Sequence, residues 1–349
     1  MRRVIGAFSV SVLTLLLAAG PALACGGLIG PNGAVNLLRT TTFAGYHDGV
    51  EHYVTSFEFA GGGGAFGSIT PLPGIPSNVE KGGDWTLQRL ILETNPQPAA
   101  DFFRLGTAGA ESAEEIATYK IDALDLTVLR GGAAAIGQWA KEHGFRLPPD
   151  APEVLEFYAS RSQIFVAAAF DADAAAERGQ AVGDGTSVHI TIPTDDPWVP
   201  LRILALGKTG GERVEADVYL LTEARPNLLP VPSGRNGISL DHSAAASDAL
   251  LADLRSDRGM EWVPSAGWLT KVRVNATAAQ LSYDLAVDET GIGAPSRIDA
   301  GINPFFPTPL EIAEAVGPAG AGTLIGLVVL VVAIGTALHV VRPMRAGAR

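Results

Sequence analysis

Residues 121–170 read IDALDLTVLRGGAAAIGQWAKEHGFRLPPDAPEVLEFYASRSQIFVAAAF, and this stretch has the clearest pattern in the chain. Residues 132–143 carry apolar side chains at helical spacing and are followed by Gly144, which suits a left-handed helix cap. Asp150, with Glu153 three residues later, forms a capping box and predicts a second helix. The centre of the chain is therefore expected to hold two consecutive helices.

Strand patterns surround these helices on both sides. The best specified is a hairpin, in which residues 34–44 and 51–60 are rich in Thr and aromatic residues and flank Asp48-Gly49, a favoured two-residue turn. The other predicted strands are residues 121–129, 163–170, 187–192, 201–206, 214–221, 268–274 and 279–287. This mixture predicts an α+β fold, mainly antiparallel sheet with several short helices, plus one C-terminal transmembrane helix.

Three further helices are predicted outside the central stretch. The first begins at Asp84, which can cap it, and shows one apolar face. A second, short helix follows the capping box of Ser112 and Glu115. The third covers residues 243–255, with Ser243 as its cap.

The N-terminus has the pattern of a cleavable leader covering residues 1–24. A short basic region and an apolar stretch precede Ala22 and Ala24, the two small residues that signal peptidase reads, so cleavage is expected just before Cys25. Two alternatives remain open. The leader could stay as an uncleaved anchor, or Cys25 could carry a lipid as the first mature residue.

The stretch TLIGLVVLVVAIGTALHVV, from Thr323 to Val341, has no acidic or basic residue apart from one His, and it spans roughly 29 Å as a helix. Arg342 and Arg345 follow it in a basic tail, residues 342–349, which places the C-terminus inside. The sequence therefore predicts a single-pass type I protein of the cell membrane, with its N-terminal domain extracytoplasmic.

The region between leader and span is predicted to have three parts. Residues 25–230 form the main α+β domain, residues 231–290 form a C-terminal extension or subdomain, and residues 291–322 form a Pro/Gly-rich stalk. This region holds 20 Lys and Arg against 37 Asp and Glu. Such an acidic balance disfavours nucleic acid as a partner, and a single cysteine excludes a disulfide within the chain.

Four polar residues at the hairpin tip are candidate metal ligands: His47, Asp48, Glu51 and His52. In a two-residue turn the two histidines fall on the same face, with donors that suit a divalent ion. Polar residues at a hairpin tip are, however, also the ordinary solvated case. No metal is therefore assigned, and these four remain candidates.

Catalytic and cofactor motifs are not recognisable. Gly62-x-Gly64-x-x-Gly67 matches the dinucleotide fingerprint, but prolines follow it where a helix must begin, so no cofactor is expected. There is no G-x-S-x-G motif, and Asp241-His242-Ser243 are consecutive and cannot converge as a triad. The catalytic residues are therefore unknown, and an enzyme is the less favoured class.

The tryptophans allow a surface interpretation. Trp139 belongs to a helix core, whereas four others stand near turns and would suit either core packing or a glycan- or peptide-binding surface. These four are Trp85, Trp198, Trp262 and Trp268.

Several motifs resemble a known bacterial family. They are the Ala-Cys-Gly-Gly start at residues 24–27, the strand exit ITPLPGIP at residues 69–76, and Trp139 followed by a G-F-x-L-P turn at residues 144–148. Together they resemble the extracytoplasmic proteins of domain of unknown function 2330, over roughly residues 24–225. The resemblance implies a leader, an α+β domain outside the cytoplasm and often a C-terminal anchor, but no accepted activity.

The expected function is a binding or interaction module of the cell envelope, with an envelope polymer or another membrane protein as its partner. The alternatives are an envelope hydrolase that uses carboxylates or bound calcium, and a structural spacer of a membrane complex. A homodimer is a further possibility, because Gly322-x-x-x-Gly326 allows close helix packing.

Overall fold

The protein is described here by a computed structural model, which covers residues 27–30, 33–34, 40–57, 66–95, 117–177 and 186–302. Several predicted features lie outside these residues, among them the leader with Cys25, the helix at Ser112, the Gly322-x-x-x-Gly326 motif, and the apolar span with its basic tail. Within the described residues, no helix is long and apolar enough to cross a membrane.

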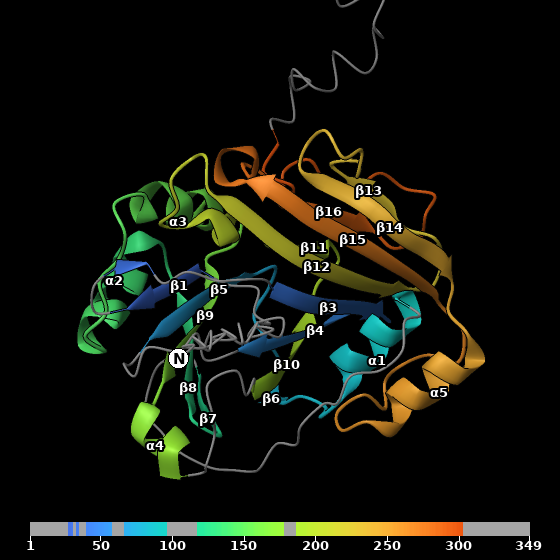
Figure 1. Cartoon of the computed structure of the whole chain (residues 1–349), viewed down its shortest axis with the longest axis horizontal. Helices are drawn as coiled ribbons and strands as arrows, with labels where there is room; N and C mark the ends of the chain where they lie inside the picture. The colour runs from blue at the N-terminus through green and yellow to red at the C-terminus, as the bar shows by residue number, and fades with distance from the viewer. Residues whose placement is uncertain are drawn as a thin grey trace, which may run out of the picture.

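Three sheets make up the described structure (Figure 1). The seven-stranded sheet has the order β14 (Ile238–Ala245), β15 (Trp268–Thr277), β12 (Arg213–Thr222), β3 (Thr40–His47), β4 (Val50–Phe57), β10 (Thr186–Pro193) and β6 (Asn78–Lys81). Every pair in it is antiparallel except β12 with β3.

The six-stranded sheet is antiparallel throughout, with the order β2 (Gly33–Ala34), β1 (Gly27–Gly30), β5 (Gly67–Leu72), β9 (Ile164–Phe170), β8 (Leu124–Arg130) and β7 (Ala117–Ile121). A small third sheet has the order β11 (Trp198–Val199), β16 (Leu285–Asp288) and β13 (Asn227–Leu229). The described helices are α1 (Thr86–Thr94), α2 (Ala133–Glu142), α3 (Ala151–Ala159), α4 (Ala172–Glu177) and α5 (Asp248–Ser256), with 3-10 turns η1 (Arg202–Ala205) and η2 (Ala278–Gln280).

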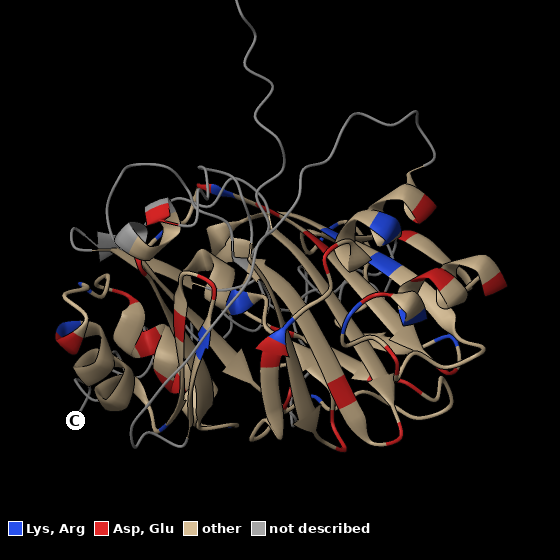
Figure 2. Ribbon diagram, turned by 90° about the horizontal axis from the view of Figure 1, so that it is seen from below, with Lys and Arg blue, Asp and Glu red and all other residues tan. Residues whose placement is uncertain are grey.

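Two hydrophobic cores lie on opposite faces of the seven-stranded sheet. Successive residues of a strand point to opposite faces. Accordingly, Phe43 packs with the leucines of α1 and α5, whereas Ala44 belongs to the larger core shared with the six-stranded sheet, α2 and α3. Acidic residues are spread over many elements (Figure 2).

The predicted α+β class with mainly antiparallel sheets is confirmed. The β3–β4 hairpin turns at Asp48 and Gly49, whose φ angles of 50° and 75° suit the expected two-residue turn. α2 ends at Glu142, and Gly144 follows with φ 72°, as a left-handed cap requires. The strands predicted around β9, β10, β12 and β15 are also present, within a few residues of their expected bounds.

One predicted strand, residues 201–206, is wrong. The segment forms η1, because the amides of Leu201 and Arg202 donate to the Asp284 carboxylate at 2.7 and 2.9 Å instead of to a neighbouring strand. The strand predicted at residues 279–287 is correct only at its end, as β16, because its beginning forms η2.

Two predicted boundaries are also wrong. Ser243 lies in β14, paired with Thr270, and α5 begins only after Ser247, whose Oγ accepts the amide of Leu250. The strand expected at residues 121–129 is present as β8 but begins only at Leu124, because the chain turns at Asp122 with φ 54° and Ile121 ends β7.

The predicted side-chain caps of α1 and α3 are wrong as well. Asp84 does not cap α1. Instead, the buried carboxylate of Asp257 accepts the amides of Asp84 and Trp85 at 3.0 and 3.1 Å. Asp150 accepts the amide of Gly207 instead of capping α3, and Glu153 binds Arg202.

The segment after Gly237 contributes β14 and β15 to the seven-stranded sheet and β16 to the small sheet. The first residues of the region predicted as a stalk also pack on this body. Ala300 is fully buried and its carbonyl accepts the amide of Asp284 at 3.0 Å. Residues 303–322 lie outside the described part.

Candidate functional site

The β3–β4 hairpin distributes the four candidate metal ligands over two faces of its sheet. Gly45 pairs with His52 and His47 with Val50, so these four residues share one face, while Glu51 lies opposite Tyr46 on the other. The two-residue turn thus places His47 and His52 on the same face, as predicted. Their side chains nevertheless join different groups, because each contacts a partner from another part of the chain.

At the tip, His47 lies between two carboxylates. Its Nδ1 is 3.2 Å from Glu223 Oε1, and its Nε2 is 3.5 Å from Asp48 Oδ2. The three side chains offer ligand atoms within 4.8 Å of one another. However, the two ring nitrogens point in different directions, so one ion can be ligated by only one of them. In this arrangement the imidazole bridges the two acids, and a metal bound by all three residues would require the ring to turn.

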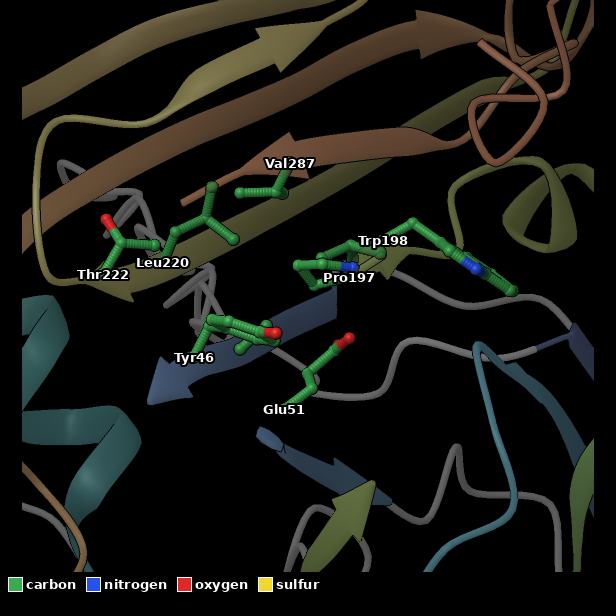
Figure 3. Close-up of a pocket in the computed structure, with 9 residues that line it drawn as sticks. Tyr46, Glu51, Pro197, Trp198, Leu220, Thr222 and Val287 are labelled. Atoms are coloured by element: carbon green, nitrogen blue, oxygen red, sulfur yellow. The ribbon is translucent and has the colours of Figure 1, made fainter. Parts of the chain in front are cut away.

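Glu51 is buried in a small cavity beneath the hairpin (Figure 3). The cavity has about 10 Å³ of free space, room for a single water, and is lined by Ala44, Tyr46, Glu51, Pro197, Trp198, Val199, Leu220, Thr222 and Val287. Neither carboxyl oxygen of Glu51 has a hydrogen-bond partner within normal geometry. Burial raises the pKa of Glu51 to about 8, and the nearby backbone amide of Trp198 offsets only part of this effect.

Tyr46 lines the same cavity, and its side chain is hydrogen-bonded to the loop that follows β10. Its hydroxyl donates to the carbonyl of Thr194 at 2.7 Å. Burial raises the pKa of Tyr46 to about 12, with smaller contributions from Glu289 and Asp195. At neutral pH both Glu51 and Tyr46 are therefore uncharged, and they lie beside the apolar side chains that line the cavity. The cavity is too small for a substrate.

His52 forms a buried pair with His189 on the other face of the sheet. Its Nδ1 lies 3.0 Å from His189 Nε2, and the other nitrogen of His189 lies 3.3 Å from Glu80. Trp262 stacks on His52 with ring centroids 3.8 Å apart, and it fits there because Gly45 has no side chain: a Cβ would lie 2.0 Å from the indole.

Burial is the main reason that this pair is uncharged. It lowers the pKa of His52 to about 3, with His189 and His47 adding smaller effects, and it also lowers the pKa of His189. A hydrogen bond between two imidazoles needs one neutral acceptor, which this burial provides. Sequence reasoning missed His189 and Trp262, since no local signal shows that β4 pairs with a strand 137 residues away.

A second buried polar cluster surrounds Asp284. Its carboxylate accepts from the hydroxyl of Tyr158 at 2.9 Å, from Arg161 at 2.6 Å, and from the two amides at the start of η1, those of Leu201 and Arg202. The guanidinium of Arg161 in turn lies 5.0 Å from the ring centroid of Trp198. The carboxylate of Asp284 is therefore fully engaged in hydrogen bonds that link α3, η1 and β16. It is not available as a catalytic acid or base.

An open groove of about 230 Å³ lies between α3, η1 and η2. We call it the α3–η2 groove; it is lined by Asp150, Glu153, Val154, Arg202, Ala205, Lys208, Gly210, Ala278, Ala279, Leu281 and Ser282. Both of its carboxylates have partners, because Asp150 accepts the Gly207 amide and Glu153 binds Arg202 at 2.5 Å. Lys208 has no ion pair within the described residues.

The four tryptophans considered for a surface are all at least half-buried. Trp198 is 2 % exposed, and the other three are half-buried. Trp268 donates its indole N–H to Ser243 at 2.9 Å, so the hydroxyl of Ser243 accepts a hydrogen bond across the β14–β15 pair and does not cap a helix.

Comparison with solved structures finds only distant likeness. The crystal structure of baculovirus P35 matches with 10 % identity over 72 % of this chain and 96 % of its own, at a TM-score of 0.39. The caspase-8/P35 complex matches with 10 % identity over 71 % of this chain and 95 % of the other, at 0.38. These scores are too low to carry an argument, and none of the curated proteins compared with the chain matches it.

A family model gives the positive finding. The model of DUF2330, described as an uncharacterized protein conserved in bacteria, matches residues 20–287. This range covers most of the chain and includes the hairpin, the Glu51 cavity and the α3–η2 groove. The chain therefore belongs to the DUF2330 family of uncharacterized bacterial proteins.

Proposed function

We propose that this chain is a single-pass envelope protein whose extracytoplasmic domain binds an envelope polymer or another membrane protein through the α3–η2 groove. The leader, the apolar span and the basic tail support the membrane location. The groove supports the binding role, because it is open to solvent and is lined by both apolar and charged side chains.

The observation that carries the proposal is the state of the charged groups in the groove. A hydrolase of the carboxylate type needs one free acid and one free base. Here Asp150 and Glu153 each hold a structural partner, whereas the ammonium of Lys208 has no ion pair in the described part of the chain. Lys208 interacts electrostatically with Glu212 but makes no salt bridge in the described residues, so its ammonium stays available for an acidic or polar group of a ligand. Such a recess suits recognition better than acid–base chemistry.

The test is co-sedimentation of the purified full chain, in detergent micelles, with isolated peptidoglycan sacculi. Lys208→Glu reverses the free charge, and Ala279→Trp fills the groove at an exposed position beside Gly210. Lys141→Glu is the matched control, because it makes the same charge change on the exposed side of α2. We expect both groove variants to lose at least tenfold in affinity and the control to bind like the wild type.

The same experiment separates the competing functions. Equal binding of all four proteins would refute the groove as the binding site. Release of soluble fragments from the sacculi by the wild type, abolished in Asp150→Asn, would favour the hydrolase. If a neighbouring membrane protein co-purifies with the wild type and with both groove variants alike, the spacer role is favoured.

A further inference from the structure

The nitrogen of His189 that faces away from His52 is buried without a hydrogen-bond partner. His189 is 2 % exposed, and its Nδ1 has no partner in normal geometry among the described residues. Its Nε2 is directed at His52 Nδ1, 3.0 Å away, so Nδ1 lies on the opposite side of the ring. A buried polar atom of this kind costs free energy unless it binds a ligand.

The carboxylate of Glu80 lies beside this nitrogen. Glu80 on β6 is directly opposite His189 on β10, so both side chains stand on the same face of the seven-stranded sheet. Glu80 Oε1 is 3.3 Å from His189 Nδ1. Two ligands at about 2.0–2.1 Å from a tetrahedral zinc ion lie roughly 3.3–3.4 Å apart. The two atoms therefore have the spacing of neighbouring ligands of one ion.

Gly259, in the loop after α5, leaves space beside both atoms. A Cβ at this position would lie 3.2 Å from His189 Nδ1 and 3.4 Å from Glu80 Oε1. Its φ of 73° is also one that glycine adopts without strain. The missing side chain thus leaves open a point that is close to both ligand atoms.

Glu261, from the same loop, offers a third ligand. Burial is the largest influence on the pKa of His189 and lowers it, whereas Glu80 and then Glu261 raise it, so the Glu261 carboxylate lies near this imidazole. Its side chain is exposed and can turn. Neither Glu80 nor Glu261 forms an ion pair with Lys or Arg in the described part of the chain. One imidazole and two uncommitted carboxylates are ligands that zinc accepts.

The loop that carries Gly259 and Glu261 is fixed on the fold. Met260 and Val263 are buried in the core formed with α1 and α5. The amide of Met260 donates to the carbonyl of Asp257 at 3.3 Å, and the amide of Val263 donates to the carbonyl of Met260 at 3.1 Å. The backbone beside His189 is therefore held in place before any ion binds.

His52 supplies the outer partner that a metal-binding histidine needs. Such a histidine usually donates its second ring N–H to a fixed acceptor, which sets the tautomer and the direction of the ring. With an ion on Nδ1, His189 would donate its Nε2–H to Nδ1 of His52. Trp262 stacks on His52 with ring centroids 3.8 Å apart and so holds this acceptor in position.

We propose that His189, Glu80 and Glu261 bind one zinc ion, with Nδ1 of His189 as the nitrogen ligand. Glu261 turns its exposed carboxylate toward the ion, and a water completes the four-coordinate set. The ion joins β10 and β6 to the loop after α5, three segments that lie far apart in the sequence. Its role is to fix this loop, and with it α5, against the seven-stranded sheet.

The test is a zinc titration of the metal-free full chain in detergent micelles, in competition with a chromogenic zinc chelator. Every protein carries Cys25→Ser, which removes the single thiol as a competing ligand. We expect one zinc per chain. Glu80→Gln and Glu261→Gln should each lower the affinity at least about tenfold, since loss of even an outer partner costs about 10–100-fold.

Glu223→Gln is the matched control. It removes a carboxylate from the other group of possible ligands, His47, Asp48 and Glu223 at the hairpin tip, and should bind zinc like the wild type. Thermal melting without zinc checks that all variants fold. With zinc, the wild type and Glu223→Gln should gain stability and the other two should not, because a ligand of the folded state raises the melting temperature.

Three results would overturn the inference. The first is a wild type without saturable zinc binding. The second is wild-type affinity in Glu80→Gln or in Glu261→Gln. The third is loss of binding in Glu223→Gln, which would place the ion at the hairpin tip. None of these results bears on the α3–η2 groove, so the proposed binding function stands or falls separately.

Discussion

Glu51→Gln should remove a large part of the pH dependence of stability. Glu51 is 1 % exposed and its carboxyl has no hydrogen-bond partner in normal geometry, so its charged form is strongly disfavoured in the folded protein. Gln has nearly the same shape and cannot ionise. The substitution therefore removes the titration while leaving the packing of the cavity in place.

The magnitude follows from the two pKa values of the Glu51 carboxyl. The folded value is about 8 and the unfolded value 4.5. Between these values the folded state binds the proton and the unfolded state does not, so stability is complete below pH 4.5 and is lost as the pH rises toward 8. At about 1.4 kcal/mol per pH unit, the wild type should lose roughly 3 kcal/mol between pH 4.5 and 7, and about 5 kcal/mol by pH 8.

The assay is urea unfolding of the full chain in micelles, followed by tryptophan fluorescence at half-unit steps from pH 5 to 8.5. We expect the free energy of unfolding of Glu51→Gln to change by less than about a third of the wild-type loss over this range. Glu215→Gln, an exposed acid on β12, is the control and should keep the wild-type slope. A variant Glu51→Gln with the wild-type slope would refute the assignment of this titration to Glu51.

Three further predictions concern the same fold. The pKa of His52 is lowered to about 3, so its contribution to stability is complete above pH 6.5 and is lost as the pH falls toward 3. His52→Phe should therefore reduce the fall in the free energy of unfolding between pH 6.5 and 3. An unchanged fall over this range would contradict the prediction. Gly45→Ala would drive a Cβ into Trp262 and should cost about 1–3 kcal/mol, whereas Gly211→Ala, with open space around it, should stay within about 0.5 kcal/mol in urea unfolding. Asp284→Asn should cost about 3–5 kcal/mol, because it leaves a buried guanidinium unpaired, and a loss under 1 kcal/mol would show that the cluster is dispensable.

Local patterns predicted those elements whose signals lie within a few residues. Asp48-Gly49 specifies the β3–β4 turn by itself, because both positions need a positive φ that Asp and Gly tolerate. The termination of α2 just before Gly144 follows for the same reason.

The errors occurred where distant partners outweighed local preference. The apolar run at residues 201–206 has the composition of a strand, yet its amides turn toward Asp284, about 80 residues later. Asp84 is a residue type that often caps helices, yet the amides at the start of α1 are bound by Asp257, which lies far away in the sequence. Composition indicates whether a segment prefers helix or strand. It does not indicate which buried carboxylate will bind the backbone amides of that segment.

The sequence alone determined the fold class, the family resemblance and the tip of the hairpin, because these depend on short-range periodicity and turn chemistry. Only the tertiary structure decided what the candidate residues do. It separated His47, Glu51 and His52 into a surface contact with Glu223, a buried acid without a hydrogen-bond partner and a histidine pair. Strand order sets these surroundings, as where β10 brings His189 beside His52. Strand order depends on packing of the whole chain, which no local pattern encodes.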